Sequence, residues 1–194
     1  IPTDLRLGER WHRWVEALVR WNHPTRGELV PDTFIALAEE TGQIIEIGQF
    51  VIQRSLEDLA RWTRSIPKHR DMRMSVNVSG RQLANDDVAA VLEQAIAAGH
   101  IVAEHVVVEV TESVLVPHES VAASQLLAID ELGASIYIDD FGTGWASLHY
   151  LRSLPVSGLK LAQEFVAGLP NEFDGGLVKA IKDLSSSMHL EGVI

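Results

Sequence analysis

Short apolar runs rich in β-branched residues alternate along the chain with longer segments of helical period. This alternation predicts parallel strands joined by helices, because the connection between two parallel strands is usually helical. We predict strands at residues 14–18, 74–78, 105–110, 135–138 and 158–161, and a last one that begins near Gly192.

Apolar residues at helical spacing predict the helices between these strands. One stripe consists of Val88, Val91, Leu92, Ala95 and Ile96, and another of Leu177, Ile181, Leu184 and Met188. Pro31 begins a helix that Gly42 ends, and a second helix carrying Ile52, Leu56 and Leu59 follows directly. The chain contains no linker, low-complexity stretch or close repeat, so we expect one domain.

Composition narrows the classes of function. The 194 residues are 46% hydrophobic, which is enough for a buried core. The formal net charge of −11 opposes binding to a nucleic-acid polymer, although a metal ion could still attract a small phosphorylated ligand. The absence of cysteine excludes disulfides and thiolate metal sites. With no signal peptide or membrane-spanning run in the sequence, we expect a soluble, cytoplasmic domain.

Polar residues recur at one end of the predicted strands. Glu16, Asn77, Glu109, Asp139 and Lys160 each lie within or at the carboxyl end of a different strand. A barrel brings such strand ends together around one mouth, whereas an open doubly wound sheet spreads them along a line. The pattern therefore favours an α/β barrel, here with fewer than the usual eight strands.

Two adjacent carboxylates, Asp139 and Asp140, follow the apolar run 135–138 and precede Phe141-Gly142-Thr143-Gly144. They would repel each other, and on a regular strand they would point to opposite faces unless the backbone turns. A divalent metal removes the repulsion, and oxygen ligands suit Mg²⁺ or Mn²⁺. An isolated Asp-Asp pair is more often a solvated turn, so the other strand ends must decide between the two interpretations.

The five strand ends together favour a metal site with room for a phosphate. Glu16, Asn77, Glu109 and Asp139 could hold one ion, and Asp139 and Asp140 a second with a ligand from elsewhere. Lys160 could orient a water or offset phosphate charge, and Arg20 could bind a phosphate oxygen. Each residue alone has an ordinary structural explanation, but charge recurring at one end of successive strands favours a site.

Several motifs resemble the EAL domain family, in the family's order and spacing. They are Glu16-Ala17-Leu18-Val19-Arg20-Trp21, Asn77-Val78-Ser79, Glu109-Val110-Thr111-Glu112, Asp139-Asp140-Phe141-Gly142-Thr143-Gly144 and Leu159-Lys160-Leu161. The resemblance implies a modified TIM (β/α)8 barrel that hydrolyses cyclic di-GMP to pGpG with Mg²⁺ or Mn²⁺.

The same resemblance implies roles for individual residues. It assigns catalytic roles to Lys160 and Glu16, substrate binding to Arg20 and Asp140, and metal binding to Glu16, Asn77, Glu109, Asp139 and Asp140. It also implies a homodimer through the region after the Asp pair, at about residues 145–152, and sensory or cyclase domains elsewhere in the parent protein. That parent could be anchored to a membrane through its other domains.

Departures from the family pattern leave three functions open. The family's first strand, its last strands and the glutamate for its second metal have no counterpart, so we expect residues 1–194 to be an EAL domain truncated at both ends and nearly inactive alone. Ala162 and Ser157 replace aspartates, and Trp14 replaces a glycine and either fills the barrel or narrows its mouth. The intact set of metal-binding residues favours a phosphodiesterase. Ala162 instead favours a cyclic di-GMP receptor, and a dimerisation scaffold is the third possibility.

Overall fold

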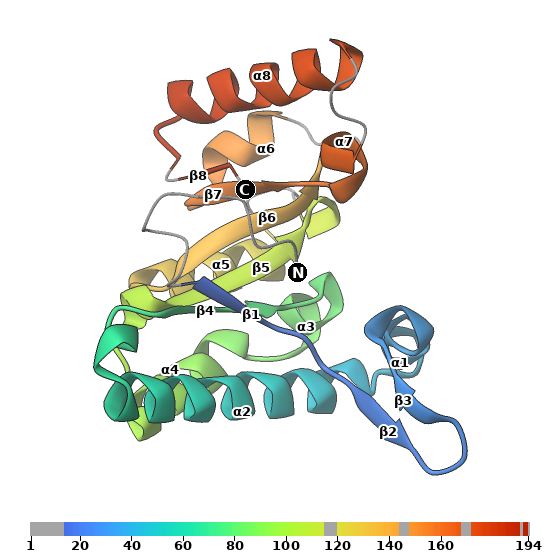
Figure 1. Cartoon of the computed structure of the whole chain (residues 1–194), viewed down its shortest axis with the longest axis vertical. Coiled ribbons are helices and arrows are strands. Elements are labelled where there is room, and N and C mark those ends of the chain that lie inside the picture. Colours follow the sequence, from blue (N-terminus) through green and yellow to red (C-terminus); the bar gives the residue numbers. More distant parts are fainter. Residues whose placement is uncertain (1–13, 115–119, 144–147, 168–171, 191, 194) are drawn as a thin grey trace.

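The computed structural model describes residues 14–114, 120–143, 148–167, 172–190 and 192–193. Its main feature is a 6-stranded parallel sheet with the strand order β1-β4-β5-β6-β7-β8 (Figure 1). The strands are β1 (Trp14–Ala17), β4 (Arg73–Asn77), β5 (Val106–Thr111), β6 (Ser135–Phe141), β7 (Gly158–Leu161) and β8 (Gly192–Val193). All six lie at or within a few residues of the ranges that the sequence predicts.

Each strand of this sheet pairs in parallel with the next one along the chain. A doubly wound sheet would reverse its strand order in the middle, whereas a barrel keeps one direction throughout. The predicted barrel-type α/β architecture is therefore confirmed. Within the described residues, β1 and β8 form the two edges of the sheet and do not pair with each other.

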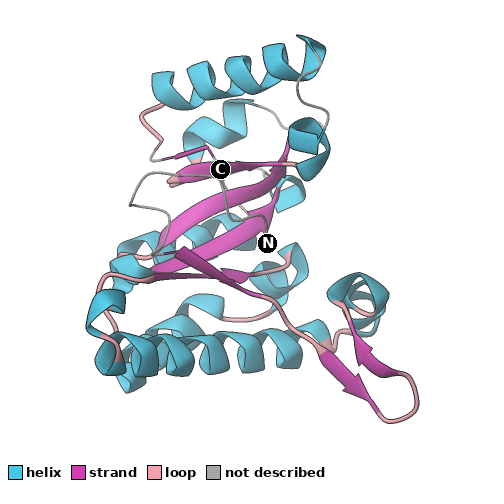
Figure 2. Cartoon of the chain, viewed as in Figure 1, coloured by secondary structure: helices cyan, strands magenta, loops and turns pink. Residues whose placement is uncertain are grey.

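Helices connect the strands and cover the sheet (Figure 2). The longer ones are α2 (Ile44–Ser65), α4 (Val88–Gly99), α5 (Val121–Glu131) and α8 (Glu172–Ser187), and the shorter ones are α3 (Gly80–Asn85), α6 (Leu148–Ser153) and α7 (Gln163–Ala167). Single turns of 3₁₀ helix lie at η3 (Pro67–His69), η4 (Ala103–His105) and η5 (Glu112–Val114). In the described part of the chain, no helix is long and apolar enough to cross a membrane.

A small antiparallel hairpin after β1 was not predicted. It consists of β2 (Trp21–His23) and β3 (Gly27–Leu29), and it projects away from the main sheet (Figure 1). Strands of three residues show too little alternation to be detected from sequence. The hairpin leads into a 3₁₀ turn, η2 (Pro31–Thr33), and then α1 (Ile35–Thr41), so the helix predicted from Pro31 is regular only from Ile35. Gly42 ends α1 at φ 81°, as predicted.

The main hydrophobic core lies between the sheet and its helices. Alternate strand residues such as Val76, Val108 and Ile136 are fully buried there, together with Leu56 of α2 and Leu126 of α5. Each buried side chain of this size contributes roughly 1.5–3 kcal/mol relative to leaving it in water. Because strand side chains alternate between faces, this pattern places the polar residues 75, 77, 109 and 139 on the other face of the sheet.

Aromatic side chains fill that other face at the amino end of the strands, which we call the floor (Trp14, Arg73, Tyr137 and Gly158). The Trp14 and Tyr137 rings meet edge to face at 5.0 Å between centroids, and the Arg73 guanidinium carbon lies 4.9 Å from the Trp14 ring centroid. A side chain at Gly158 would overlap the Tyr137 ring. Trp14 therefore fills the floor of the sheet and does not narrow the mouth.

Candidate functional site

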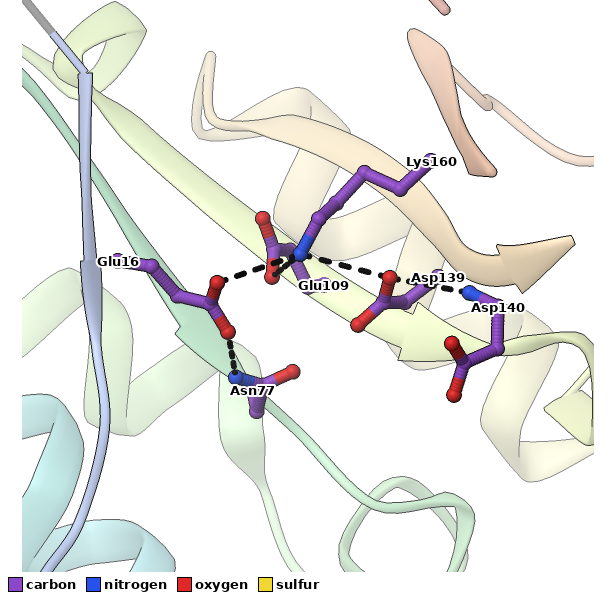
Figure 3. A network of polar contacts seen from close by, with 6 residues as sticks. All are labelled: Glu16, Asn77, Glu109, Asp139, Asp140 and Lys160. Carbon is purple, nitrogen blue, oxygen red and sulfur yellow. Dashed lines mark hydrogen bonds and ion pairs between the residues drawn. The ribbon is translucent and has the colours of Figure 1, made fainter. Parts of the chain in front are cut away.

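The predicted polar residues come together at the carboxyl end of the strands, which we call the mouth (Glu16, Asn77, Glu109, Asp139, Asp140 and Lys160). At its centre the Lys160 ammonium lies 2.7 Å from Glu109 Oε2, 3.4 Å from Glu16 Oε2 and 3.4 Å from Asp139 Oδ1 (Figure 3). The Asn77 amide donates to Glu16 Oε1 at 2.8 Å. Residues as far apart as 16 and 160 in sequence thus form one network.

Strand register explains this convergence. Asn77 on β4 pairs with Glu109 on β5, and Thr111 on β5 pairs with Asp139 on β6. Side chains two residues apart on a strand share a face, so Glu109 lies on the same face as Thr111. Because Thr111 pairs with Asp139, the Glu109 and Asp139 side chains lie on the same face of the sheet. The site follows from the same alternation that buries the hydrophobic residues on the helical face.

The Asp pair lies at an irregularity in the sheet. Ile138 pairs with Leu159 and Phe141 with Leu161, so Asp139 and Asp140 stand opposite the single residue Lys160. Such a bulge re-aims the side chains beside it. Asp140 has φ 52°, in the left-handed region that few non-glycine residues adopt, and its N–H donates to Asp139 Oδ1 at 3.0 Å. The backbone therefore turns at the pair, as adjacent carboxylates on one strand require.

Burial and charge shift the pKa values at the mouth. Burial raises the pKa of Glu109, which is 1% exposed, although the hydrogen bond from Lys160 partly opposes the shift. Burial, followed by the neighbouring Asp139 charge, raises the pKa of Asp140. Burial alone would lower the pKa of Lys160, but Glu109, Asp139 and Glu16 outweigh it and raise that pKa. Lys160 is therefore a fixed cation that holds three carboxylates in place.

A cavity of about 510 Å³ opens beside these residues. Its walls include Asn77, Glu109, Asp139 and Asp140 on one side and residues of α1 and α2 on the other. Arg20 does not line this cavity. It lines an apolar hollow of about 410 Å³ beside the hairpin, and its guanidinium donates to the Val19 carbonyl at 3.0 Å. Arg20 also lines a hollow of about 290 Å³ that Glu16 lines. The structure thus brings the acidic residues and Lys160 together and places Arg20 beside the strand that carries Glu16, and its predicted role stays a prediction.

Glu112 is a further polar residue that the sequence reasoning did not single out. It is 8% exposed, and its Oε2 accepts a hydrogen bond from the Gly142 N–H at 2.9 Å. The contact ties the loop after β5 to the loop after the Asp pair. The signal available in the sequence was a carboxylate three residues after Glu109, but spacing alone gives no reason for burying it. Part of the predicted dimer region, residues 145–147, lies outside the described residues.

Ser157 and Ala162, which stand where the family pattern has aspartates, lie at opposite ends of β7. Ala162 follows the strand and is 3% exposed. Lys160 is held by three carboxylates without any contribution from position 162. Ser157 precedes the strand, and its hydroxyl accepts the Ile136 N–H at 3.1 Å. The substitution at 157 is therefore accommodated by the sheet, far from the mouth.

The chemistry of the mouth suits a hard divalent cation. Its donors are carboxylate and amide oxygens, and Glu109 Oε1 is buried without a hydrogen bond of normal geometry, with only a weak contribution from the nearby Ser75 hydroxyl. Among the described residues, however, no three acidic or histidine side chains lie close enough to bind one ion as they stand. The Lys160 ammonium occupies the space between them. The donor set fits a divalent ion, provided that these side chains rearrange.

Comparison with known proteins places this chain in a family. The EAL domain model matches residues 9–194. Cyclic di-GMP phosphodiesterase PdeR of Escherichia coli is 36% identical over 92% of this chain and 27% of its own length. Cyclic di-GMP phosphodiesterase NbdA of Pseudomonas aeruginosa is 39% identical over 92% of this chain and 23% of its own length. The chain thus spans about a quarter of these curated relatives.

Solved structures agree with the sequence comparison. The PaMucR phosphodiesterase in a c-di-GMP complex superposes with a TM-score of 0.85 at 34% identity, over 93% of this chain and 72% of that one. The FimX EAL domain of Pseudomonas aeruginosa, bound to c-di-GMP, gives a TM-score of 0.76 over 91% of this chain and 70% of that one, but at 23% identity it supports the fold alone. By sequence and fold, this chain belongs to the EAL domain family.

Proposed function

We propose that this chain is the catalytic domain of a divalent-metal-dependent phosphodiesterase that hydrolyses cyclic di-GMP to pGpG. The observation that carries the proposal is the mouth, where Glu16, Glu109 and Asp139 from three strands surround Lys160. Relatives that share more than a third of its residues are named cyclic di-GMP phosphodiesterases.

The reaction adds water to one phosphodiester and breaks one P–O bond to a ribose oxygen, which leaves with a proton. Bound Mg²⁺ or Mn²⁺ would offset phosphate charge and activate the water, with Glu16, Asn77, Glu109, Asp139 and Asp140 as the proposed ligands. Lys160 remains protonated because its pKa is raised, so it orients the water and stabilises developing negative charge on the phosphate.

Two further roles belong to this proposal. Asp140 lines the cavity beside the bulge, where it would contact the substrate as well as an ion. Arg20 lies on the exposed segment between β1 and β2, and it reaches a phosphate oxygen only if its side chain leaves the Val19 carbonyl. Glu16 contacts both Asn77 and Lys160, which supports its two proposed roles as a metal ligand and as a catalytic residue.

The experiment measures release of pGpG from cyclic di-GMP by the parent protein, with Mg²⁺ or Mn²⁺ and with a chelator. We expect metal-dependent release that Glu16→Ala abolishes, while Gln94→Met, an exposed change on α4, leaves the rate unchanged. Tight binding of cyclic di-GMP without turnover in either metal would contradict the proposal.

That outcome would favour the second candidate function, a cyclic di-GMP receptor. Ala162 supports it, because a carboxylate usual in the family is missing just after β7. The contacts of Lys160 argue the other way, since three carboxylates already hold its ammonium. A receptor would keep its affinity for cyclic di-GMP after chelation of metal, whereas the phosphodiesterase would lose turnover.

We further propose a cytoplasmic location, a homodimer and accompanying sensory or cyclase domains. The absence of cysteine supports a reducing compartment. Curated relatives about four times as long support additional domains. Helix α6 (Leu148–Ser153) overlaps the segment expected at the dimer interface. Sedimentation of the chain with and without substitutions at Arg152 tests the dimer.

A further inference from the structure

A buried glutamine lies directly behind the Asn77 segment of the mouth. Gln82 of α3 is 2% exposed, and its side-chain carbonyl accepts the Ser79 N–H at 3.1 Å. The Gln82 N–H in turn donates to the Ser79 hydroxyl at 3.2 Å. This reciprocal pair is a capping box, in which helix-start and side-chain groups satisfy each other.

The Gln82 amide is also confined from the opposite side by helix α2. A Cβ atom added at Gly48 would overlap Nε2 and Cδ of Gln82, so only glycine leaves room for the amide. Gly48 lies in the interior of a helix of 22 residues, where glycine is a poor helix former. The amide nitrogen of Gln82 is buried without a hydrogen-bond partner. Packing against Gly48 and the bond to Ser79 therefore fix the amide between α2 and the loop after β4.

That loop begins with the Asn77 ligand proposed above. Asn77 ends β4 and donates to Glu16, the next residue Val78 donates its N–H to the Glu109 carbonyl at 2.8 Å, and Ser79 begins the capping box. Only one residue separates Asn77 from Ser79. Gln82 and Gly48 both line the cavity that Asn77 lines. The capping box and the Asn77 side chain are therefore joined through a single residue, Val78, whose N–H is bonded to the strand beside it.

We propose that Gln82 is a positioning residue, which Gly48 braces and which sets the side chain of Asn77 for its ion and for Glu16. The role in metal binding rests on the proposed function, whereas the positioning of Asn77 does not. An ordinary capping box would instead stabilise only α3, a helix of six residues, and leave Asn77 unchanged.

Two variants displace the amide by different routes. Gln82→Met keeps most of the volume but removes the acceptor for the Ser79 N–H. Gly48→Ala keeps the glutamine at position 82, but the new methyl group overlaps its amide and pushes the amide away from Ser79. Alanine is also a better helix former than glycine, so any effect of Gly48→Ala on the mouth does not come from a weaker helix α2. Combining Gly48→Ala with Gln82→Ala removes the overlap. The double variant should therefore have a higher melting temperature than Gly48→Ala alone.

The first measurement needs no metal. In the labelled 194-residue chain, NMR follows the Asn77 side-chain amide and the hydrogen exchange of the Val78 N–H. We expect both Gln82→Met and Gly48→Ala to shift the Asn77 amide signals and to speed exchange at Val78.

A second measurement is calorimetry with Mn²⁺ alone. The affinity for Mn²⁺ should be about 10-fold weaker in both variants, as is typical when a residue that supports a metal ligand is lost.

Two controls separate positioning from general destabilisation. Gln94→Met makes the same chemical change on the exposed surface of α4. Leu126→Ala empties a fully buried site on α5 and lowers stability by at least as much as the test variants. Neither control should alter the Asn77 signals or the Mn²⁺ affinity.

The outcomes then decide the matter. The proposal is overturned if Gln82→Met and Gly48→Ala only lower stability. In that case the Asn77 signals and the Mn²⁺ affinity would be unchanged, as expected for Leu126→Ala. A parent protein that neither binds Mn²⁺ nor hydrolyses cyclic di-GMP refutes the proposed function instead. In that case the NMR comparison still stands, because unchanged Asn77 signals overturn the positioning role and altered ones support it.

Discussion

At the floor of the sheet, Trp14 packs against both Tyr137 and Arg73, and Gly158 gives the Tyr137 ring its space. At the mouth, on the same face of the same strands, four carboxylates cluster around or beside one lysine, and Asp140 adopts a left-handed backbone conformation. The floor satisfies packing, whereas the mouth gathers like charges and backbone strain.

The difference shows how one sheet serves two purposes. Charges gathered in a partly buried site cost stability unless they are paired, so the mouth is held together by Lys160 and supported by the packed floor and core. Strain of this kind persists only where the surrounding structure overdetermines it. Substitutions at the mouth should therefore change activity more than stability, and substitutions at the floor should do the reverse.

The largest effect is expected from Asp139→Ala at the mouth. It removes a carboxylate that contacts Lys160 and that we propose as a metal ligand, so turnover of cyclic di-GMP should fall about 10³-fold or more. Chromatography of released pGpG measures the rate. Ser135→Ala, on the same strand near the floor, is the control and should remain within a few-fold of the parent. Similar losses in both variants would contradict the division between mouth and floor.

Next in size is a loss of stability from Gly158→Ala at the floor. The new methyl group overlaps the Tyr137 ring, and overpacking of this kind costs about 1–3 kcal/mol. Urea unfolding measures the cost, which Tyr137→Leu in the same background should partly recover. Gly176→Ala on α8, where a Cβ meets nothing within 4 Å, should be neutral or stabilising. A Gly158→Ala protein as stable as its parent would show that the floor is not tightly packed.

A smaller effect of opposite sign is expected from Asp140→Gly. Glycine adopts φ 52° without strain and removes the repulsion from Asp139, so unfolding should require about 1 kcal/mol more while activity is lost. Asp140→Ala removes the charge but keeps the strained backbone, and it separates the two causes. If Asp140→Gly unfolds more easily than the parent, the mouth does not store strain at this residue.

The smallest effect is expected from Ala162→Asp, which restores the carboxylate usual in the family. Lys160 is already held by Glu109, Glu16 and Asp139, so the rate should change by less than about threefold, equivalent to about 0.7 kcal/mol. Steady-state kinetics over a range of cyclic di-GMP concentrations gives the change. A gain above tenfold would mean that position 162 limits the orientation of Lys160 or of the substrate.

Much of the fold and part of the site could be predicted because local signals were strong. β-branched runs and helical stripes predicted the main strands and several of the helices, and polar residues at strand ends predicted the mouth. Prediction failed where the information is not local. The β2–β3 hairpin is too short for a detectable period, and the buried Glu112 carboxylate accepts a hydrogen bond from Gly142, which is 30 residues away in sequence. Arg20 lines hollows beside the hairpin, one of them together with Glu16, and not the cavity that Asp139 and Asp140 line.

The sequence by itself determined which residues alternate between the two faces of each strand, and hence which carboxylates and which lysine share a face. It also determined family membership, because the motifs recur at the family's spacing. Only the tertiary structure decided that Lys160 contacts three carboxylates, that a bulge turns Asp140 out of regular strand geometry, and that Trp14 packs at the floor. The physical reason is that each of these features depends on the register between strands, and register is fixed by packing across the whole sheet.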